Sequence, residues 1–143
     1  MFLRTKKVRG YEYVYLVRSE YRSGKVKQKV IKYLGKANLP EKDNGLLFKD
    51  FIAEDFSEYI KRVTYKDFVA DVSRWLVNRY SFDERKIYKL NEGYFCNFTI
   101  KKLMSFDPSK HEDPEREFAK TYLNAGFPRD EKDIFIALFL KLK

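Results

Sequence analysis

The stretch Tyr11–Lys36, YEYVYLVRSEYRSGKVKQKVIKYLGK, has the sequence pattern of a basic β-hairpin. From Tyr11 to Tyr21 the side chains alternate between two faces and are rich in aromatic and β-branched types, as is typical of a strand. The turn is expected at Arg22-Ser23-Gly24, because glycine readily adopts the positive φ that a tight reversal needs. A basic return strand then runs from Lys25 to Leu34 and places Val26, Val30 and Leu34 on an apolar core face. Ile31 is out of phase with that face, which suggests either a bulge or a second buried face.

Positive charge is concentrated in the same part of the chain. Residues 1–36 contain eleven Lys or Arg and two acids, whereas residues 37–143 contain nineteen of each, so the net charge of +9 belongs to the first quarter. Such asymmetry is the electrostatic footprint of a segment that binds a polyanion. The predicted partner is therefore a nucleic acid. DNA is favoured, while RNA and the choice between single strand and duplex stay open.

The hairpin carries two kinds of side chain that contact nucleic acids. Lys and Arg neutralise phosphates, and tyrosines stack on bases or pack against sugars. In an alternative interpretation the tyrosines belong to the core and the lysines only solubilise the surface. The predicted phosphate-binding residues are Arg18, Arg22, Lys25, Lys27, Lys29 and Lys32, and the predicted stacking residues are Tyr13, Tyr15 and Tyr33.

The whole chain is expected to form an α+β protein. Residues 1–9 predict either an edge strand, which would complete a short three-stranded antiparallel meander, or a mobile basic arm. Residues 37–45 contain Pro40 and an Asn-Gly pair, which are typical of a linker. The predicted domains are the basic β-meander at 1–36, the linker at 37–45 and a helical domain at 46–143, built as a bundle of about five helices.

Apolar spacing and capping residues define the expected helices. Thr64 with Asp67, and Ser81 with Glu84, have the spacing of a capping box, and Asp113 precedes a proline that suits the first position of a helix. The run IFIALFL near the C-terminus is apolar nearly all round, which predicts a buried central helix. The predicted helical segments are 46–63, 64–80, 81–92, 94–106 (where a strand is the alternative), 113–125 and a last one from Pro128 or Asp130.

No pattern in the sequence indicates catalysis, and no cofactor or metal site is predicted. His111-Glu112-Asp113 lies near Asp107, Glu115 and Glu117, but position 115 is Glu where a zinc-protease motif requires a second His. Acids at the start of a helix account for this cluster. The protein is therefore predicted not to be an enzyme, and the apolar surroundings of Cys96 predict a buried, inert thiol.

Composition favours a cytoplasmic protein with no membrane partner. The chain has one cysteine, no run of 18 apolar residues, and an N-terminus without the apolar core of a signal peptide. A charged fraction of 36% with a single Gln also fits a heat-adapted organism. An archaeal source is a further prediction.

The hairpin resembles the N-terminal element of archaeal and bacterial insertion-sequence transposases of the IS4/IS1634 type. The shared pattern is an aromatic strand, a Tyr-Arg-x-Gly-Lys turn and a basic strand that ends in Tyr-Leu-Gly. The resemblance implies a small DNA-associated β-element. It does not extend to the Asp/Asp/Glu catalytic domain of those enzymes, because residues 46–143 lack the required strand pattern. The matching residues are Tyr13, Tyr15, Leu16, Val17, Ser19, Tyr21, Arg22, Gly24, Lys25, Val26, Gln28, Val30, Tyr33, Leu34 and Gly35.

Three functions are consistent with these patterns. The favoured one is a DNA-binding protein that contacts the phosphate backbone through the hairpin and is regulatory or accessory to a mobile element or virus. The second is a protein–protein interaction module in which the hairpin edge pairs with a partner strand. The third is a small metal-dependent nuclease that uses the acids between Asp107 and Glu117. Homodimerisation through the helical domain is a further prediction.

Overall fold

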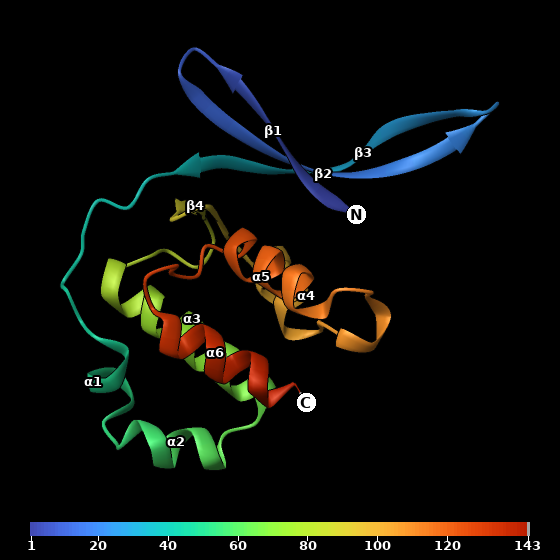
Figure 1. Cartoon of the computed structure of the whole chain (residues 1–143). Coiled ribbons are helices and arrows are strands. Elements are labelled where there is room, and N and C mark those ends of the chain that lie inside the picture. Colours follow the sequence, from blue (N-terminus) through green and yellow to red (C-terminus); the bar gives the residue numbers. More distant parts are fainter. Residues whose placement is uncertain (143) are drawn as a thin grey trace.

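The computed structural model describes residues 1–142 and shows a long β-ribbon that lies across one side of a helical body (Figure 1). The first three strands form an antiparallel meander, and two short strands from the middle of the chain extend it to a five-stranded sheet with the order β1-β2-β3-β4-β5. β4 is parallel to β3 and antiparallel to β5. The strands are β1 (Phe2–Val8), β2 (Tyr11–Arg22), β3 (Lys25–Asn38), β4 (Ile87–Leu90) and β5 (Gly93–Phe95).

This sheet is larger than the predicted three-stranded meander. Residues 2–8 pair with β2 along their whole length, which confirms the edge strand and not the mobile arm. The helix predicted at 81–92 is wrong, since part of this segment forms β4. The side chain of Asp83 accepts a hydrogen bond from the backbone N–H of Arg85 at 3.0 Å and makes a turn, and Asn91 reverses the chain at φ 54°. The turn at Asp83 therefore forms in place of the helix that the capping-box spacing of Ser81 and Glu84 predicted.

Six α-helices form the body within residues 1–142, where about five were predicted. Two of the predicted caps are confirmed: Thr64 accepts from the backbone N–H of Asp67, and Asp113 accepts from that of Arg116. The helices are α1 (Phe48–Ile52), α2 (Phe56–Arg62), α3 (Tyr65–Tyr80), α4 (Asn97–Met104), α5 (Pro114–Asn124) and α6 (Lys132–Lys141), with a short 3-10 helix at Pro108–Lys110.

Three predicted helices differ from the structure. The segment 46–63 is split into α1 and α2, because Ala53 adopts a left-handed conformation and Asp55 caps the second piece. The segment 94–106 divides into the end of β5 and α4, which begins at Asn97. The last helix is not central, since Ile136 and Leu140 of α6 are 53% and 57% exposed. α3 is the central helix instead, and five of its side chains are buried.

Aromatic rings fill much of the core. Trp75 of α3 is fully buried, packs against Phe48 of α1 and donates its indole N–H to the carbonyl of Leu46 at 2.8 Å. A smaller cluster around Val14, Ile87 and Cys96 joins the ribbon to the helical body. Cys96 is buried as predicted.

The segment between the ribbon and the helices is held against α3. Residues 39–47 have no regular secondary structure, but Arg79 donates to the carboxylate of Asp43 at 2.8 Å, and the backbone N–H of Asn44 donates to the carbonyl of Arg79. β3 continues to Asn38, where it meets β4. The sheet therefore draws strands from both predicted domains, and the division of the chain at 36 and 46 stays a prediction.

Candidate nucleic-acid interface

The outer half of the β2–β3 hairpin projects beyond the helical body (Figure 1). Every residue from Tyr21 to Tyr33 is exposed, including Val26 at 63% and Val30 at 59%. The expectation that these valines belong to a core face is wrong, because more than half of each side chain is exposed. The projecting ribbon is accessible from both faces.

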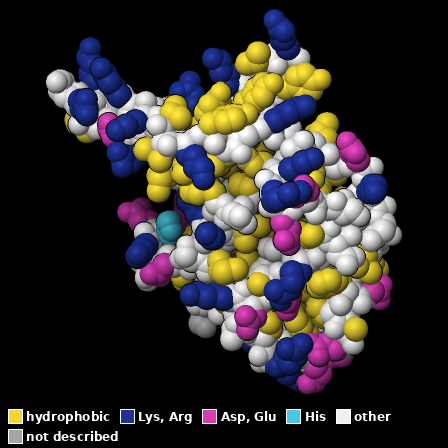
Figure 2. Space-filling view, turned by 180° about the vertical axis from the view of Figure 1, so that it is seen from behind, with side chains coloured by type: hydrophobic (Ala, Val, Ile, Leu, Met, Phe, Trp, Pro, Cys, Tyr) yellow, Lys and Arg dark blue, Asp and Glu magenta, His cyan; other side chains and the backbone are white. Residues whose placement is uncertain are grey.

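The strand register places the hairpin cations on one face. Arg18 lies opposite Lys29, and Arg22 lies opposite Lys25, and residues directly opposite each other in a sheet share a face. We call this surface the cationic face, and it contains Arg18, Glu20, Arg22, Lys25, Lys27, Lys29 and Lys32. Figure 2 shows Lys and Arg side chains gathered along the projecting ribbon. The six predicted phosphate-binding residues thus lie together.

A β-bulge keeps Lys32 on the cationic face. Lys29 and Lys32 are three residues apart, so a regular strand would place them on opposite faces. The register shifts by one residue between Leu16 and Val17, and Ile31 is the extra residue on β3. The predicted bulge is therefore confirmed. Lys32 also lines a pocket with Arg85 and Lys86, two cations that the sequence did not associate with the hairpin.

Most cations of this face have no acidic partner. Among residues 1–142, the ion pair within the cationic face joins Arg18 to Glu20 at 2.7 Å. The hydrogen bond from Arg18 lowers the pKa of Glu20. A row of exposed cations with one acid among them is a surface that attracts phosphate groups.

The predicted stacking residues lie on the opposite face of the same strands. Tyr13 and Tyr15 alternate with Val14, which packs into the small cluster against the body, so their rings point away from the helices. Tyr33 lies opposite Tyr15, with ring centroids 5.2 Å apart, and 6.5 Å from the ring of Tyr13. The structure therefore separates the tyrosines from the six phosphate-binding candidates. The two sets do not form one site.

Sequence reasoning missed the cations that accompany the tyrosines. On β1, Arg4 lies opposite Tyr15 and Lys6 lies opposite Tyr13. The Nζ atom of Lys36 lies 3.8 Å from the ring centroid of Tyr11. Alternation on each strand was visible in the sequence, but the pairing between strands was not. We call this surface the tyrosine face: Tyr11, Tyr13, Tyr15, Tyr33, Arg4, Lys6 and Lys36.

Glu12 fixes the base of the ribbon to the body. Its carboxylate accepts hydrogen bonds from the hydroxyl of Tyr94 at 2.7 Å and from Lys89 at 3.1 Å. The hydrogen bond from Tyr94 and that from Lys89 lower the pKa of Glu12. Burial and the contact with Glu12 raise the pKa of Tyr94 to about 12. These contacts orient the two faces of the ribbon relative to the helices.

The attachment through Glu12 predicts a pH-dependent stability. Because the folded-state pKa of Glu12 lies below its ordinary value of 4.5, the carboxylate stabilises the fold above that pH and loses this effect as pH falls through the lowered pKa. Glu12→Gln should therefore lower the melting temperature at neutral pH, and the difference from the intact protein should shrink in acid. Thermal unfolding followed over a pH series tests this. Glu112→Gln, which alters an exposed acid, is the control, and an equal effect of both variants would contradict the prediction.

In the acidic cluster at 107–117, several side chains make contacts that stabilise the local structure. Asp107 accepts hydrogen bonds from the backbone N–H and hydroxyl of Ser109, and Asp113 caps α5. His111 stacks on the ring of Phe106, with centroids 5.0 Å apart. Within residues 1–142 there is no group of three or more His, Cys, Asp or Glu side chains that could hold a metal ion.

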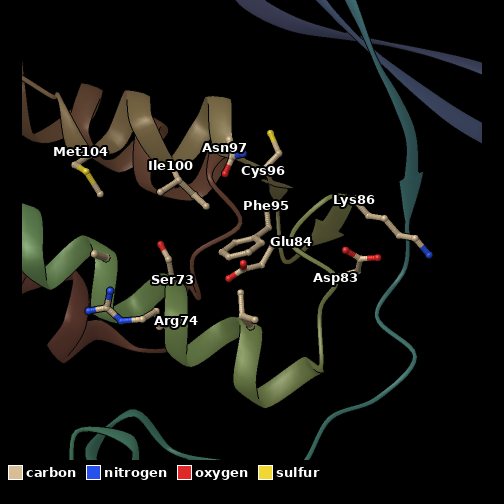
Figure 3. A pocket seen from close by; sticks show the side chains of 12 residues that line it. Ser73, Arg74, Asp83, Glu84, Lys86, Phe95, Cys96, Asn97, Ile100 and Met104 are labelled. Atoms are coloured by element: carbon tan, nitrogen blue, oxygen red, sulfur yellow. The ribbon is translucent and has the colours of Figure 1, made fainter.

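A pocket of about 320 Å³ lies between α3, α4 and β5 (Figure 3). Several of its polar side chains already have partners. Arg74 pairs with Asp71, and the hydroxyl of Ser73 donates to the carbonyl of Val69. Hydrogen bonds from Arg85 lower the pKa of Asp83 to about 2. We assign no function to this pocket.

Comparison with known families connects the ribbon with transposases. Residues 3–67 match the N-terminal domain of IS1634 family transposases. This confirms the resemblance that the hairpin sequence indicated. The match also continues past the ribbon, through α1 and α2 into the first turn of α3. Searches of curated proteins and of solved structures found no match for the chain.

The match is to one domain of those transposases and does not extend past residue 67. The matched residues include all of both faces of the ribbon. No helix within residues 1–142 is long and apolar enough to cross a membrane.

Proposed function

We propose that the protein binds duplex DNA through the cationic face of the ribbon and serves as a regulatory or accessory component of a mobile element or virus. The observation that supports this most directly is the gathering of six exposed Lys and Arg side chains on one face of a projecting two-stranded ribbon. A ribbon of this kind fits the major groove of B-DNA. The match to a transposase N-terminal domain supports DNA as the nucleic acid.

Binding of this kind should tolerate changes of DNA sequence. Lys and Arg contacts to phosphates position a protein on a duplex but carry no sequence information directly. The cationic face consists almost entirely of such side chains. We therefore expect similar affinities for duplexes of unrelated sequence.

The test is duplex binding by a variant that lacks three of these charges. Lys25/Lys27/Lys29→Gln should bind roughly 100-fold more weakly at low salt, because each lost cation forfeits the release of about one counterion. Fluorescence anisotropy with a labelled duplex measures the affinity. Lys42/Lys66/Lys132→Gln is the matched control, since it changes the net charge equally at exposed positions outside the ribbon.

Two results of this comparison would argue against the proposal. Equal weakening by both triple variants would mean that net charge, and not the cationic face, governs binding. Unchanged binding by the ribbon variant would overturn the proposal.

The interaction-module alternative has less support from the structure. The hairpin edge is open along β3, since β4 pairs only with Ala37 and Asn38. A strand added to this edge would have to accommodate Lys25, Lys27 and Lys29, and lysines typically guard edges against pairing. That alternative predicts salt-insensitive binding to a protein and no affinity for DNA. The nuclease alternative predicts cleavage that requires Mg²⁺ and is lost in Asp113→Ala. We propose binding without catalysis, so incubation of bound duplex with Mg²⁺ should leave it intact.

Homodimerisation through the helical part stays a prediction. Ile136 and Leu140 are exposed one turn apart on α6 and would be covered by a second copy. If they pair two chains, sedimentation should show a dimer that Ile136→Lys dissociates. A monomer at all concentrations would contradict this. A cytoplasmic location and a heat-adapted, archaeal source also stay predictions.

A further inference from the structure

We infer that the tyrosine face, on the opposite side of the ribbon from the cationic face, binds single-stranded DNA by stacking its bases. This inference rests on the proposed function in that it assigns a second class of DNA ligand to the same ribbon. The ribbon would then hold a duplex on one face and an unpaired strand on the other.

The shape of the tyrosine face suits unpaired bases. Its rings come from two neighbouring strands and follow one another across the sheet surface, with Tyr33 between Tyr13 and Tyr15. Tyr11 and Tyr33 are 52% and 51% exposed, so their rings are open to a ligand. Exposed aromatic rings on a sheet are the usual platform for single strands, because every unpaired base offers a flat face for stacking. Bases inside a duplex are already stacked on one another.

The charges of the tyrosine face suit a polyanion. Arg4, Lys6 and Lys36 surround the rings. The acids of β2, Glu12 and Glu20, both lie on the opposite face, because their positions alternate with those of the tyrosines. Rings flanked by cations, with no acid from the three strands among them, combine stacking with attraction to the backbone of a single strand. An apolar protein partner would instead leave these cations without counter-charges.

The position of the tyrosine face also leaves it free for a ligand. The cluster that joins ribbon to body contains Val14, Leu3 and Leu34 from the sheet. Val14 alternates with Tyr13 and Tyr15 along β2, so that packing uses the other face. The rings are therefore not needed to hold the ribbon on the helices. Packing of the ribbon against the body therefore does not account for the four tyrosines on this accessible face, whereas binding of a single strand does.

The test compares ligands that differ only in their bases. Labelled oligo(dT), an abasic strand of equal length and a duplex are titrated with the intact protein and with Tyr11/Tyr33→Ala. We expect the intact protein to prefer oligo(dT) to the abasic strand. The variant should lose about tenfold or more of its oligo(dT) affinity, while its affinity for the abasic strand and the duplex stays unchanged. Tyr11/Tyr33→Phe keeps the rings and should bind like the intact protein.

The outcomes distinguish this inference from the proposed function. Tight duplex binding with no preference for bases over the abasic strand would overturn the inference and leave the proposed function standing. No binding of any DNA would overturn both. Equal oligo(dT) affinity for the Ala variant and the intact protein would also overturn the inference. The emission of the buried Trp75 verifies that each variant is folded.

Discussion

Gly93→Ala should strongly destabilise the protein, although it adds only one methyl group. A Cβ atom at Gly93 would lie less than 3.0 Å from the backbone carbonyl oxygens of Leu123 and Asn124, at the end of α5. Backbone atoms cannot give way as a flexible side chain can, so β5 and α5 would have to separate. We expect a loss of about 3 kcal/mol or more, which lowers the melting temperature by roughly 6–12 °C in a protein of this size.

Gly45→Ala is the matched control for this prediction. Nothing lies within 4 Å of a Cβ atom at Gly45, and its φ of +71° is the main source of strain. The control should therefore cost only about 1 kcal/mol, the penalty of a left-handed backbone. Thermal unfolding of both variants measures the difference. Equal melting temperatures would mean that β5 does not lie against the end of α5.

Phe118→Ala should remove the centre of the aromatic core. The ring of Phe118 is fully buried and ties α5 to α3, α6 and the segment after α4. Truncation to Ala leaves a cavity that surrounding backbone cannot fill, which typically costs about 3–5 kcal/mol. The contacting rings are Tyr65, Phe106, Tyr122, Phe135 and Phe139.

Urea unfolding followed through the emission of Trp75 measures this loss. Trp75 is the single tryptophan and is fully buried, so its signal reports the helical core. Phe118→Leu should cost clearly less, because it keeps an apolar side chain in the site. Duplex binding should persist in both variants below their unfolding midpoints, since Phe118 is not part of the ribbon. A marginal effect of Phe118→Ala would contradict the packing described here.

The sequence predicted the elements that rest on local patterns. The hairpin, its turn and the caps at Thr64 and Asp113 each follow from a few neighbouring residues. β4 could not be predicted in this way, because it pairs with β3, about fifty residues earlier in the chain, and β5 in turn pairs with β4. The sequence predicts a helix that ends just before Gly93, yet the role of this glycine is to admit the backbone of α5, a contact that no local pattern reveals.

In the candidate site, too, local features could be predicted from the sequence, whereas contacts between strands could not. The cations and tyrosines of the ribbon were identifiable from composition and alternation. Their separation onto opposite faces depends on the bulge at Ile31 and on the register with β1, and neither the pairing of Arg4 with Tyr15 nor that of Lys6 with Tyr13 can be derived from one strand alone. Which part of the hairpin meets the body was also undetermined, so Val26 and Val30 were wrongly assigned to a core face.

The most direct test of the cationic face is the salt dependence of duplex binding. If all six of its Lys and Arg side chains contact phosphates, the logarithm of the binding constant should fall against the logarithm of salt concentration with a slope of about −5. The slope for Lys25/Lys27/Lys29→Gln should be shallower by about 3, and that for Lys42/Lys66/Lys132→Gln should equal the slope of the intact protein. A slope near zero, or the same slope for the intact protein and the ribbon variant, would contradict the account.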